Sequence, residues 1–334
     1  MGTSTEKESL HISSRVPPLD LIFWSGKGVG SEISRFAMTA AEMLEYCYAT
    51  DFNSKIFKKY DPGYTKKPDL VILGEIFPKE SFRFGHILEK EGDITIGGIS
   101  TYKAQICPVG GNNKEHFLVS YNPKTVGKII LKPLYNPPPS DGRKNPLKIA
   151  VYMSSSGDNY HTTAYNIIAF HFENAIAQTA MKKLEEEING GLRSGNQAHN
   201  PHLLIGDTNL DKKPFKTRNQ EQSDDGNSIY FPNMEEIILY DEKGALTATS
   251  AANGRLTKTI DRAWFNKKFV QAIGCGWGFG PQGKKYDLSQ NKAKTQELQA
   301  GVSPLSQGEN QTLAGLSDHT AVGIRLSRTV GSSI

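Results

Sequence analysis

Short strand-like segments recur along the whole 334-residue chain, and they constrain its fold more than any other feature of the sequence. Each is a run of apolar or β-branched residues that ends near Gly, Pro, Asn or Asp, which is the pattern of a strand bounded by turns. The predicted strands cover residues 19–24, 70–73, 95–101, 117–121, 126–131, 147–154, 164–172, 202–205, 259–265 and 320–326. Strands therefore dominate the predicted structure.

Helical periodicity appears in two stretches only. Ser31 is a suitable N-cap for a first helix, and the apolar face of that helix comprises Ile33, Phe36, Ala37, Ala40, Leu44 and Cys47. A second helix places apolar residues at every fourth position from Ile176 to Ile188, and we expect it to end at Gly190 and Gly191. Because strands and helices do not alternate regularly, the pattern favours an α/β sandwich (α+β class) of two packed sheets.

The chain reads as a single domain that spans residues 19–328. Residues 1–18 form a polar, flexible lead, and residues 329–334 form a short tail. Residues 279–315 are rich in Gln, Lys, Gly and Ser with almost no apolar side chains, so we predict a long loop insert there.

Composition excludes several classes of protein. Hydrophobic residues make up 37% and charged residues 22%, which is a globular balance. No apolar run approaches the roughly 20 residues needed to cross a bilayer, so the sequence predicts no transmembrane segment. The three cysteines are far apart, which excludes a disulfide framework and fits a reducing compartment.

The polar start of the chain lacks the apolar region of a signal peptide. We therefore expect a location in the cytoplasm or nucleus, while export by a route without a signal peptide stays open. We also expect the protein to be a monomer. The formal net charge of +4 permits a phosphate-rich partner without requiring one.

The strongest chemical signal is the segment Ile205-Gly206-Asp207-Thr208-Asn209, which follows a buried strand. Alternation along a strand places Asp207 and Asn209 on the same side. A carboxylate and an amide at that position can hold a divalent metal and a phosphate oxygen together. The structural alternative is an Asx-rich turn, which such sequences often form.

Other polar residues also sit at strand ends, and each has a purely structural alternative. Glu75 follows a buried apolar run. It is either a hard oxygen ligand for Mg²⁺ or a solvated residue at the end of a strand. His171 ends another apolar run, and it is either a residue of the site or a histidine of the core. The pairs Asp261-Arg262 and Asp318-His319 belong to a site or to ordinary surface ion pairs.

The order of these motifs resembles the endonuclease/exonuclease/phosphatase superfamily, whose members include deoxyribonuclease I. Strand-Glu, strand-His, Gly-Asp-x-Asn, a late strand Asp and Ser-Asp-His follow one another between residues 19 and 327. The resemblance implies a four-layer, deoxyribonuclease I-like α/β sandwich of two mostly antiparallel sheets flanked by helices. It also implies a phosphoester hydrolase that depends on Mg²⁺, with Mn²⁺ as the alternative ion.

The resemblance assigns metal binding to Glu75 and Asp318. A metal held there would neutralise charge that develops on the phosphate. The superfamily usually has an Asn at the end of its first strand, whereas this chain has Ser25, which lacks an amide's paired donor and acceptor. Ser25 and Arg262 are the predicted substrate-binding positions besides Asn209.

The resemblance also implies the catalytic roles. His171 contacts the scissile phosphate or the leaving oxygen. Asp207 and Asn209 orient the nucleophile and the phosphate, and His319 is the catalytic histidine, oriented by Asp261. The glycines of residues 26–31 do not have the spacing of a nucleotide-binding loop, and a plain turn is the better interpretation.

Three functions remain open at this point. The first is a nuclease acting on DNA or RNA, for which lysine and arginine clusters in loops would contact phosphates. The second is a phosphatase or phosphodiesterase acting on inositol phosphates or phospholipid head groups. Enzymes of that class usually carry Trp-Cys-Asp-Arg, of which Thr259-Ile260-Asp261-Arg262 keeps only Asp-Arg. The third is a non-catalytic binding module on the same fold, which the serine at position 25 motivates.

Overall fold

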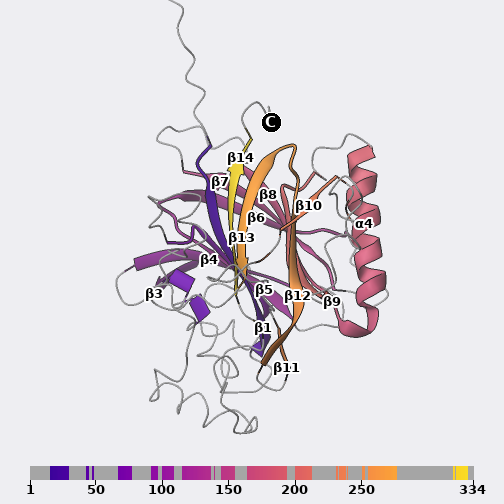
Figure 1. Cartoon of the computed structure of the whole chain (residues 1–334). Helices are drawn as coiled ribbons and strands as arrows, with labels where there is room; N and C mark the ends of the chain where they lie inside the picture. Colours follow the sequence, from indigo (N-terminus) through magenta and orange to yellow (C-terminus); the bar gives the residue numbers. More distant parts are fainter. Residues whose placement is uncertain are drawn as a thin grey trace, which may run out of the picture.

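Two β-sheets pack face to face in the computed structural model of the chain, and a long helix lies against one outer face (Figure 1). The structure describes residues 16–29, 43–44, 47–48, 67–76, 92–96, 100–108, 115–136, 139, 144–154, 164–193, 200–212, 231, 233–237, 239, 250–252, 255–276, 319 and 321–329.

The first sheet has seven strands in the order β13-β14-β1-β2-β5-β4-β3. Their bounds are β13 (Val270–Gly276), β14 (Val322–Arg328), β1 (Leu19–Val29), β2 (Leu70–Ile76), β5 (His116–Tyr121), β4 (Ser100–Pro108) and β3 (Gly92–Ile96). Only β1 and β2 run parallel, and the other pairs are antiparallel.

The second sheet has the order β10-β12-β9-β8-β7-β6, with β11 pairing to β12. Their bounds are β10 (Glu235–Glu236), β12 (Arg255–Phe265), β9 (Leu203–Lys212), β8 (Tyr165–His171), β7 (Leu147–Met153), β6 (Val126–Pro133) and β11 (Ser250–Ala252). Here β8 and β9 form the parallel pair. The predicted sandwich of two mostly antiparallel sheets is confirmed.

The core lies between the sheets because alternate residues of the strands point inward. In the second sheet Ile167, Ala169, Leu203 and Ile205 are fully or almost fully buried in this core. Residues one position along these strands face outward and pack against the helix. This alternation decides which polar side chains reach the mouth of the sandwich.

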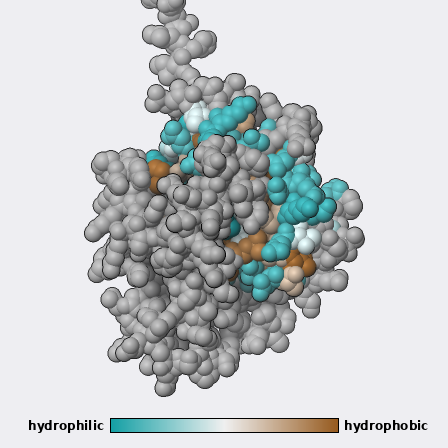
Figure 2. Space-filling view, turned by 45° about the vertical axis from the view of Figure 1, so that its right-hand side comes forward, coloured by the Kyte–Doolittle hydropathy of each residue, from teal (hydrophilic) through white to brown (hydrophobic). Residues whose placement is uncertain are grey.

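Helix α4 (Ala177–Arg193) follows a 3₁₀ turn, η1 (Asn174–Ile176), and covers the outer face of the second sheet. Leu184 and Ile188 of its apolar stripe are buried in one cluster with Phe170 and Trp264 of the sheet. In Figure 2, hydrophilic side chains cover most of the described surface on the side that is turned forward. Among the described residues no helix is both long and apolar enough to span a bilayer.

The predicted end of this helix at Gly190 and Gly191 is wrong, because α4 continues through both glycines to Arg193. A glycine inside a helix costs only about 1 kcal/mol relative to alanine, and the buried turns before it outweigh that cost. A Cβ atom added at Gly190 would meet nothing within 4 Å, so no tertiary contact requires glycine there.

The outer face of the first sheet is covered by the helical residues Met43, Leu44, Cys47 and Tyr48, all buried. The Tyr48 hydroxyl donates to Ser120 Oγ of β5 at 3.0 Å, and its ring stacks on Tyr102 of β4. Ser31 and the predicted start of this helix lie outside the described residues, as do residues 279–315. At the end of the predicted lead, Val16 packs against the core and the Pro17 carbonyl accepts a hydrogen bond from Tyr165.

Two turns of the same design carry the described chain from one sheet to the other. After β5, Asn122 accepts backbone bonds from Thr125 and Val126 and caps Lys124 N–H with its side chain. After β12, Asn266 does the same for Phe269, Val270 and Lys268. Both are turns in which an Asx side chain bonds the backbone two residues on.

Candidate active site

Three acidic or imidazole side chains of the second sheet reach the mouth of the sandwich by continuing the inward alternation of its strands. His171 follows Ile167 and Ala169 on β8, and Asp207 follows Leu203 and Ile205 on β9. These strands are parallel and His171 pairs with Asp207, so both residues lie at the same end of the sheet. Asp261 of the antiparallel β12 pairs with Asp207 from the other side.

The first sheet contributes Glu75, and a local irregularity turns this side chain toward the site. Glu75 has a φ of 56°, in the left-handed region, and the β2–β5 register shifts between Leu73 and Ile76. Such a bulge re-aims a side chain that regular alternation would send outward. Ser25 at the corresponding point of β1 is fully buried and donates its hydroxyl to Glu75 Oε1 at 3.0 Å.

Asn209 is the second described non-glycine residue with a positive φ, at 50°. Its backbone N–H donates to Asp207 Oδ1 at 2.7 Å, which is the bond of an Asx turn. Its side-chain amide donates to the Phe172 carbonyl at 2.6 Å and to Asp207 Oδ2 at 3.3 Å. The Asx-turn interpretation of this motif therefore holds, and the turn fixes the Asp207 carboxylate.

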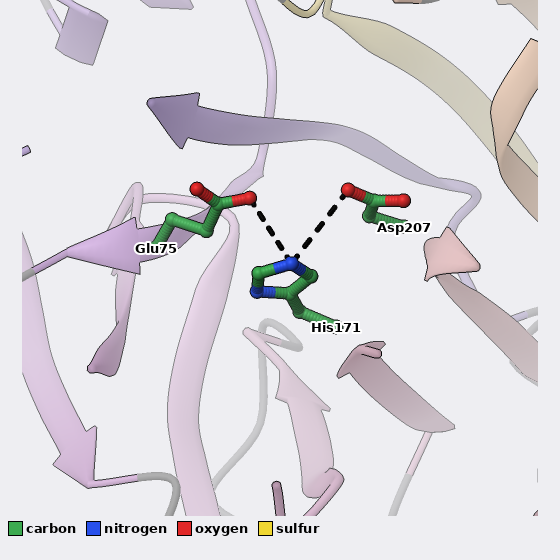
Figure 3. Close-up of side chains that lie close together, drawn as sticks. All are labelled: Glu75, His171 and Asp207. Carbon is green, nitrogen blue, oxygen red and sulfur yellow. Dashed lines mark ion pairs between the residues drawn. The ribbon is translucent and has the colours of Figure 1, made fainter. Parts of the chain in front are cut away.

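His171 brings the two sheets together at the site. Its Nε2 lies 3.2 Å from Glu75 Oε1 of the first sheet and 3.7 Å from Asp207 Oδ2 of the second. Figure 3 shows these two carboxylates on either side of the ring nitrogen. The buried imidazole is thus placed between acidic groups that approach from opposite sheets.

His319 approaches the same carboxylate from another direction. Its Nδ1 lies 2.7 Å from Asp261 Oδ2, and its Nε2 lies 3.6 Å from Asp207 Oδ2. The backbone carbonyl of His319 accepts a hydrogen bond from the Trp24 indole at 2.8 Å, which ties this residue to β1. Asp207 therefore lies between the Nε2 atoms of two imidazoles.

Among the described residues, sequence reasoning missed the buried Lys144 and the partly buried Glu115 beside His171. Glu115 Oε2 lies 3.1 Å from His171 Nδ1, and Lys144 Nζ lies 2.9 Å from the same nitrogen and 2.7 Å from Glu115. Neither residue belongs to a recognisable motif. The sequence indicates only that they stand just before β5 and β7. The starts of these strands come to the site when the two sheets pack together.

Arg262 does not join this group. Its guanidinium makes a bidentate ion pair with Glu236, at 2.8 Å for each bond, and stacks over the Trp264 ring. Because Arg262 neighbours Asp261 on a strand, alternation places its side chain on the opposite, helix-covered face. Asp318 lies outside the described residues, so its predicted metal-binding role stays a prediction.

The charges of the site raise the proton affinity of its central groups. Burial, followed by the negative charge of Asp261, raises the pKa of Asp207 to about 7. Burial lowers the pKa of His171, but its hydrogen bond to Glu115 and the charges of Glu75 and Asp207 outweigh this effect and raise it. Carboxylates crowded in this way favour a bound cation.

Within the part of the chain that the structure describes, two overlapping groups have the spacing of cation ligands. Glu75, His171 and Asp207 form one, and Asp207, Asp261 and His319 form the other, with ligand atoms within 4.8 Å of one another in each. Carboxylate oxygens suit Mg²⁺ and Mn²⁺, so the oxygen-rich donor set fits the ion that the motifs implied.

In metal-free protein, we expect stability to fall as the pH rises from about 4 to about 7, because Asp207 binds its proton more tightly when folded. The pKa of this carboxyl rises from 3.8 to about 7, so its contribution is full below about 4 and lost above about 7. Its upper bound is about 4 kcal/mol, and His171 adds a contribution of the same sign.

Urea unfolding in EDTA at several pH values, on wild type and Asp207→Asn, measures this effect. The variant's free energy of unfolding should change less between pH 5 and 8. Parallel pH curves for the two proteins would show that Asp207 titrates normally.

Comparison with known proteins supports the fold through solved structures alone. No protein-family model matches the chain, and no curated protein matches its sequence. An endonuclease/exonuclease/phosphatase family protein from Bacteroides thetaiotaomicron matches with a TM-score of 0.51 and 13% identity, over 94% of this chain and 99% of that one.

Two further structures match with lower TM-scores. A humanized D. rerio TDP2 gives 0.46 at 14% identity, over 93% of this chain and 99% of that one. The human Nocturnin catalytic domain gives 0.44 at 12% identity, over 93% and 95%. The packed sheets and the first of these three similarities show that the chain has a deoxyribonuclease I-like fold, similar to that of the Bacteroides thetaiotaomicron protein.

Proposed function

We propose that the chain is a Mg²⁺-dependent phosphodiesterase that hydrolyses nucleic-acid phosphodiester bonds. One observation carries the proposal: the buried Asp207 carboxylate lies between two imidazole Nε2 atoms, at 3.7 and 3.6 Å. Each imidazole has charged partners at its other nitrogen, Lys144 and Glu115 for His171 and Asp261 for His319. Imidazoles fixed in this way can bind phosphate oxygens and move protons.

The roles of the residues follow from their surroundings. Asp207 lies between the two imidazoles and is placed to orient an attacking water. Asn209 holds the Asp207 carboxylate in place through two hydrogen bonds. His319, oriented by Asp261, is placed to stabilise the negative charge that grows on a phosphoryl oxygen. His171 faces the same space from the β8 side.

Glu75 and Asp207 would hold the divalent ion, together with Asp318 if its side chain reaches the site. The ion supplies neutralisation of phosphate charge. Ser25 fixes Glu75 Oε1 by a hydrogen bond, and we assign it this supporting role in place of direct substrate contact. The serine at the usual Asn position then still serves the site.

Arg262, the residue shared with inositol phosphatases, is engaged by Glu236 on the helix-covered face of the second sheet, which favours a nucleic-acid substrate over an inositol phosphate.

The test compares substrate classes in one experiment. Supercoiled plasmid, RNA and inositol polyphosphates are each incubated with the protein in Mg²⁺ or in EDTA. We expect metal-dependent cutting of nucleic acid and no release of inorganic phosphate from the inositol compounds. Phosphate release without cutting would favour the inositol phosphatase, and binding without turnover would favour a binding module.

A further inference from the structure

The Nδ1 atom of His171 faces two groups with opposite hydrogen-bonding needs. Lys144 Nζ lies 2.9 Å from it and Glu115 Oε2 lies 3.1 Å from it, and these two partners are 2.7 Å apart. Only 3% of the Lys144 side chain and 14% of the Glu115 side chain are exposed. Water therefore has little access to this triangle, and its members must satisfy one another.

Lys144 is held firmly at this place. Its neighbour Asn145 accepts a hydrogen bond from Tyr135 N–H at 2.9 Å and donates one to the Tyr135 carbonyl at 2.8 Å. Glu115 precedes β5 of the first sheet, whereas Lys144 precedes β7 of the second. The ion pair thus joins the two sheets beside the imidazole.

Only one neutral form of the ring suits all these neighbours. An ammonium group donates only, and a carboxylate accepts only. A proton on Nδ1 would point toward Lys144 as well as Glu115. It would also leave a bare Nε2 facing the carboxylates of Glu75 at 3.2 Å and Asp207 at 3.7 Å.

The other neutral form satisfies every group. With the proton on Nε2, Nδ1 accepts from Lys144, and Lys144 donates a second hydrogen bond to Glu115. Nε2 then donates toward Glu75. His319 differs, because its Nδ1 faces only the Asp261 carboxylate, at 2.7 Å, and therefore carries a proton.

We propose that Lys144 is a positioning residue that keeps the proton of His171 on Nε2. This imidazole is then a hydrogen-bond donor toward the site and has no lone pair there for a metal. Two rings held in a similar way around Asp207 consequently do different work. The donation to a phosphate oxygen rests on the proposed function, whereas the position of the proton does not.

Histidine side-chain ¹⁵N NMR of the metal-free protein tests the proton's position without any turnover. The chain has 8 histidines, so the His171 signals are assigned by comparison with His171→Gln. At a pH where the ring is neutral, we expect an unprotonated Nδ1 and a protonated Nε2 in wild type. A protonated Nδ1 in neutral wild type would overturn the proposal, whatever the variants do.

Three variants then test the role of Lys144. In Lys144→Met we expect Nδ1 to become protonated, because Glu115 is then its remaining partner, and kcat to fall roughly 10- to 100-fold. Glu115→Gln/Lys144→Met restores a donor through the amide, so Nδ1 should lose its proton again and most of kcat should return. Lys144→Arg keeps the donor and should leave Nδ1 unprotonated.

The outcomes separate the two proposals. An inactive wild type with the expected ¹⁵N pattern would refute the phosphodiesterase and leave the tautomer assignment intact. Should Lys144→Met leave Nδ1 unprotonated, or should the double variant stay as impaired as Lys144→Met, Lys144 has only a structural role. If Lys144→Met does not fold, the wild-type and Lys144→Arg spectra still decide the proton's position.

Discussion

Replacing His319 by alanine is expected to lower metal-dependent phosphodiester cleavage on the order of 10³-fold or more. The ring lies 3.6 Å from the Asp207 carboxylate and is the described group best placed to offset charge growing on a phosphoryl oxygen. Steady-state rates on plasmid and on a small diester measure the loss. Because chemistry and not binding is affected, kcat should fall more than KM rises.

Asp261→Asn should cause a loss of similar size, although the side chain keeps its shape. The carboxylate lies 2.7 Å from Nδ1 of His319 and fixes the ring's tautomer and orientation. Lys183→Gln, on the exposed face of α4, is the control for substitution away from the site and should retain full activity. If His319→Ala kept more than about a tenth of wild-type activity, His319 would have no direct part in the reaction.

Gly206→Ala is expected to prevent normal folding or to cost at least about 3 kcal/mol of stability. A Cβ at this position would lie 2.0 Å from the Phe170 carbonyl oxygen and 2.6 Å from its ring. The contact involves backbone, so it is relieved only by moving β8 or β9. Those strands carry His171 and Asp207, and activity should therefore fall together with stability.

Gly190→Ala is the matched control for the same substitution at an open site. Nothing lies within 4 Å of its Cβ, and alanine favours a helix by roughly 1 kcal/mol. Thermal unfolding should thus show Gly190→Ala at or slightly above wild type and Gly206→Ala far below it. Equal midpoints for Gly206→Ala and wild type would mean that β8 and β9 are spaced more widely than described here.

The sequence predicted those parts of the site that regular alternation places. His171, Asp207 and Asp261 continue the inward face of predicted strands, and the motif order indicated that these strands would meet. The fold followed from the same pattern, because strands with one apolar face must pack in pairs. The residues named by motif and lying within the described structure converge, apart from Arg262.

The missing parts depend on departures from regularity and on long-range pairing. The positive φ values of Glu75 and Asn209 arise at register shifts, which apolar periodicity does not encode. Glu115 and Lys144 stand before strands of different sheets, and only the packing of those sheets brings them to His171. The prediction that the helix ends at the glycines was wrong for a related reason. Burial of the helix against the sheet outweighed the low helix propensity of glycine.

The two matching Asn turns at 122 and 266 connect the two sheets at one end of the molecule. Both follow strands whose last residues pair with the first residues of β2 and β9, so they lie at the pole opposite Glu75 and Asp207. Figure 1 shows the arch from β12 to β13 at that upper pole. The described chain therefore crosses between the sheets at one end of the sandwich, and the acidic residues of the site lie at the other end. Because these turns connect the sheets, we expect substitutions in them, far from the site, to change the tilt of the sheets and thereby the distance between Glu75 and His171.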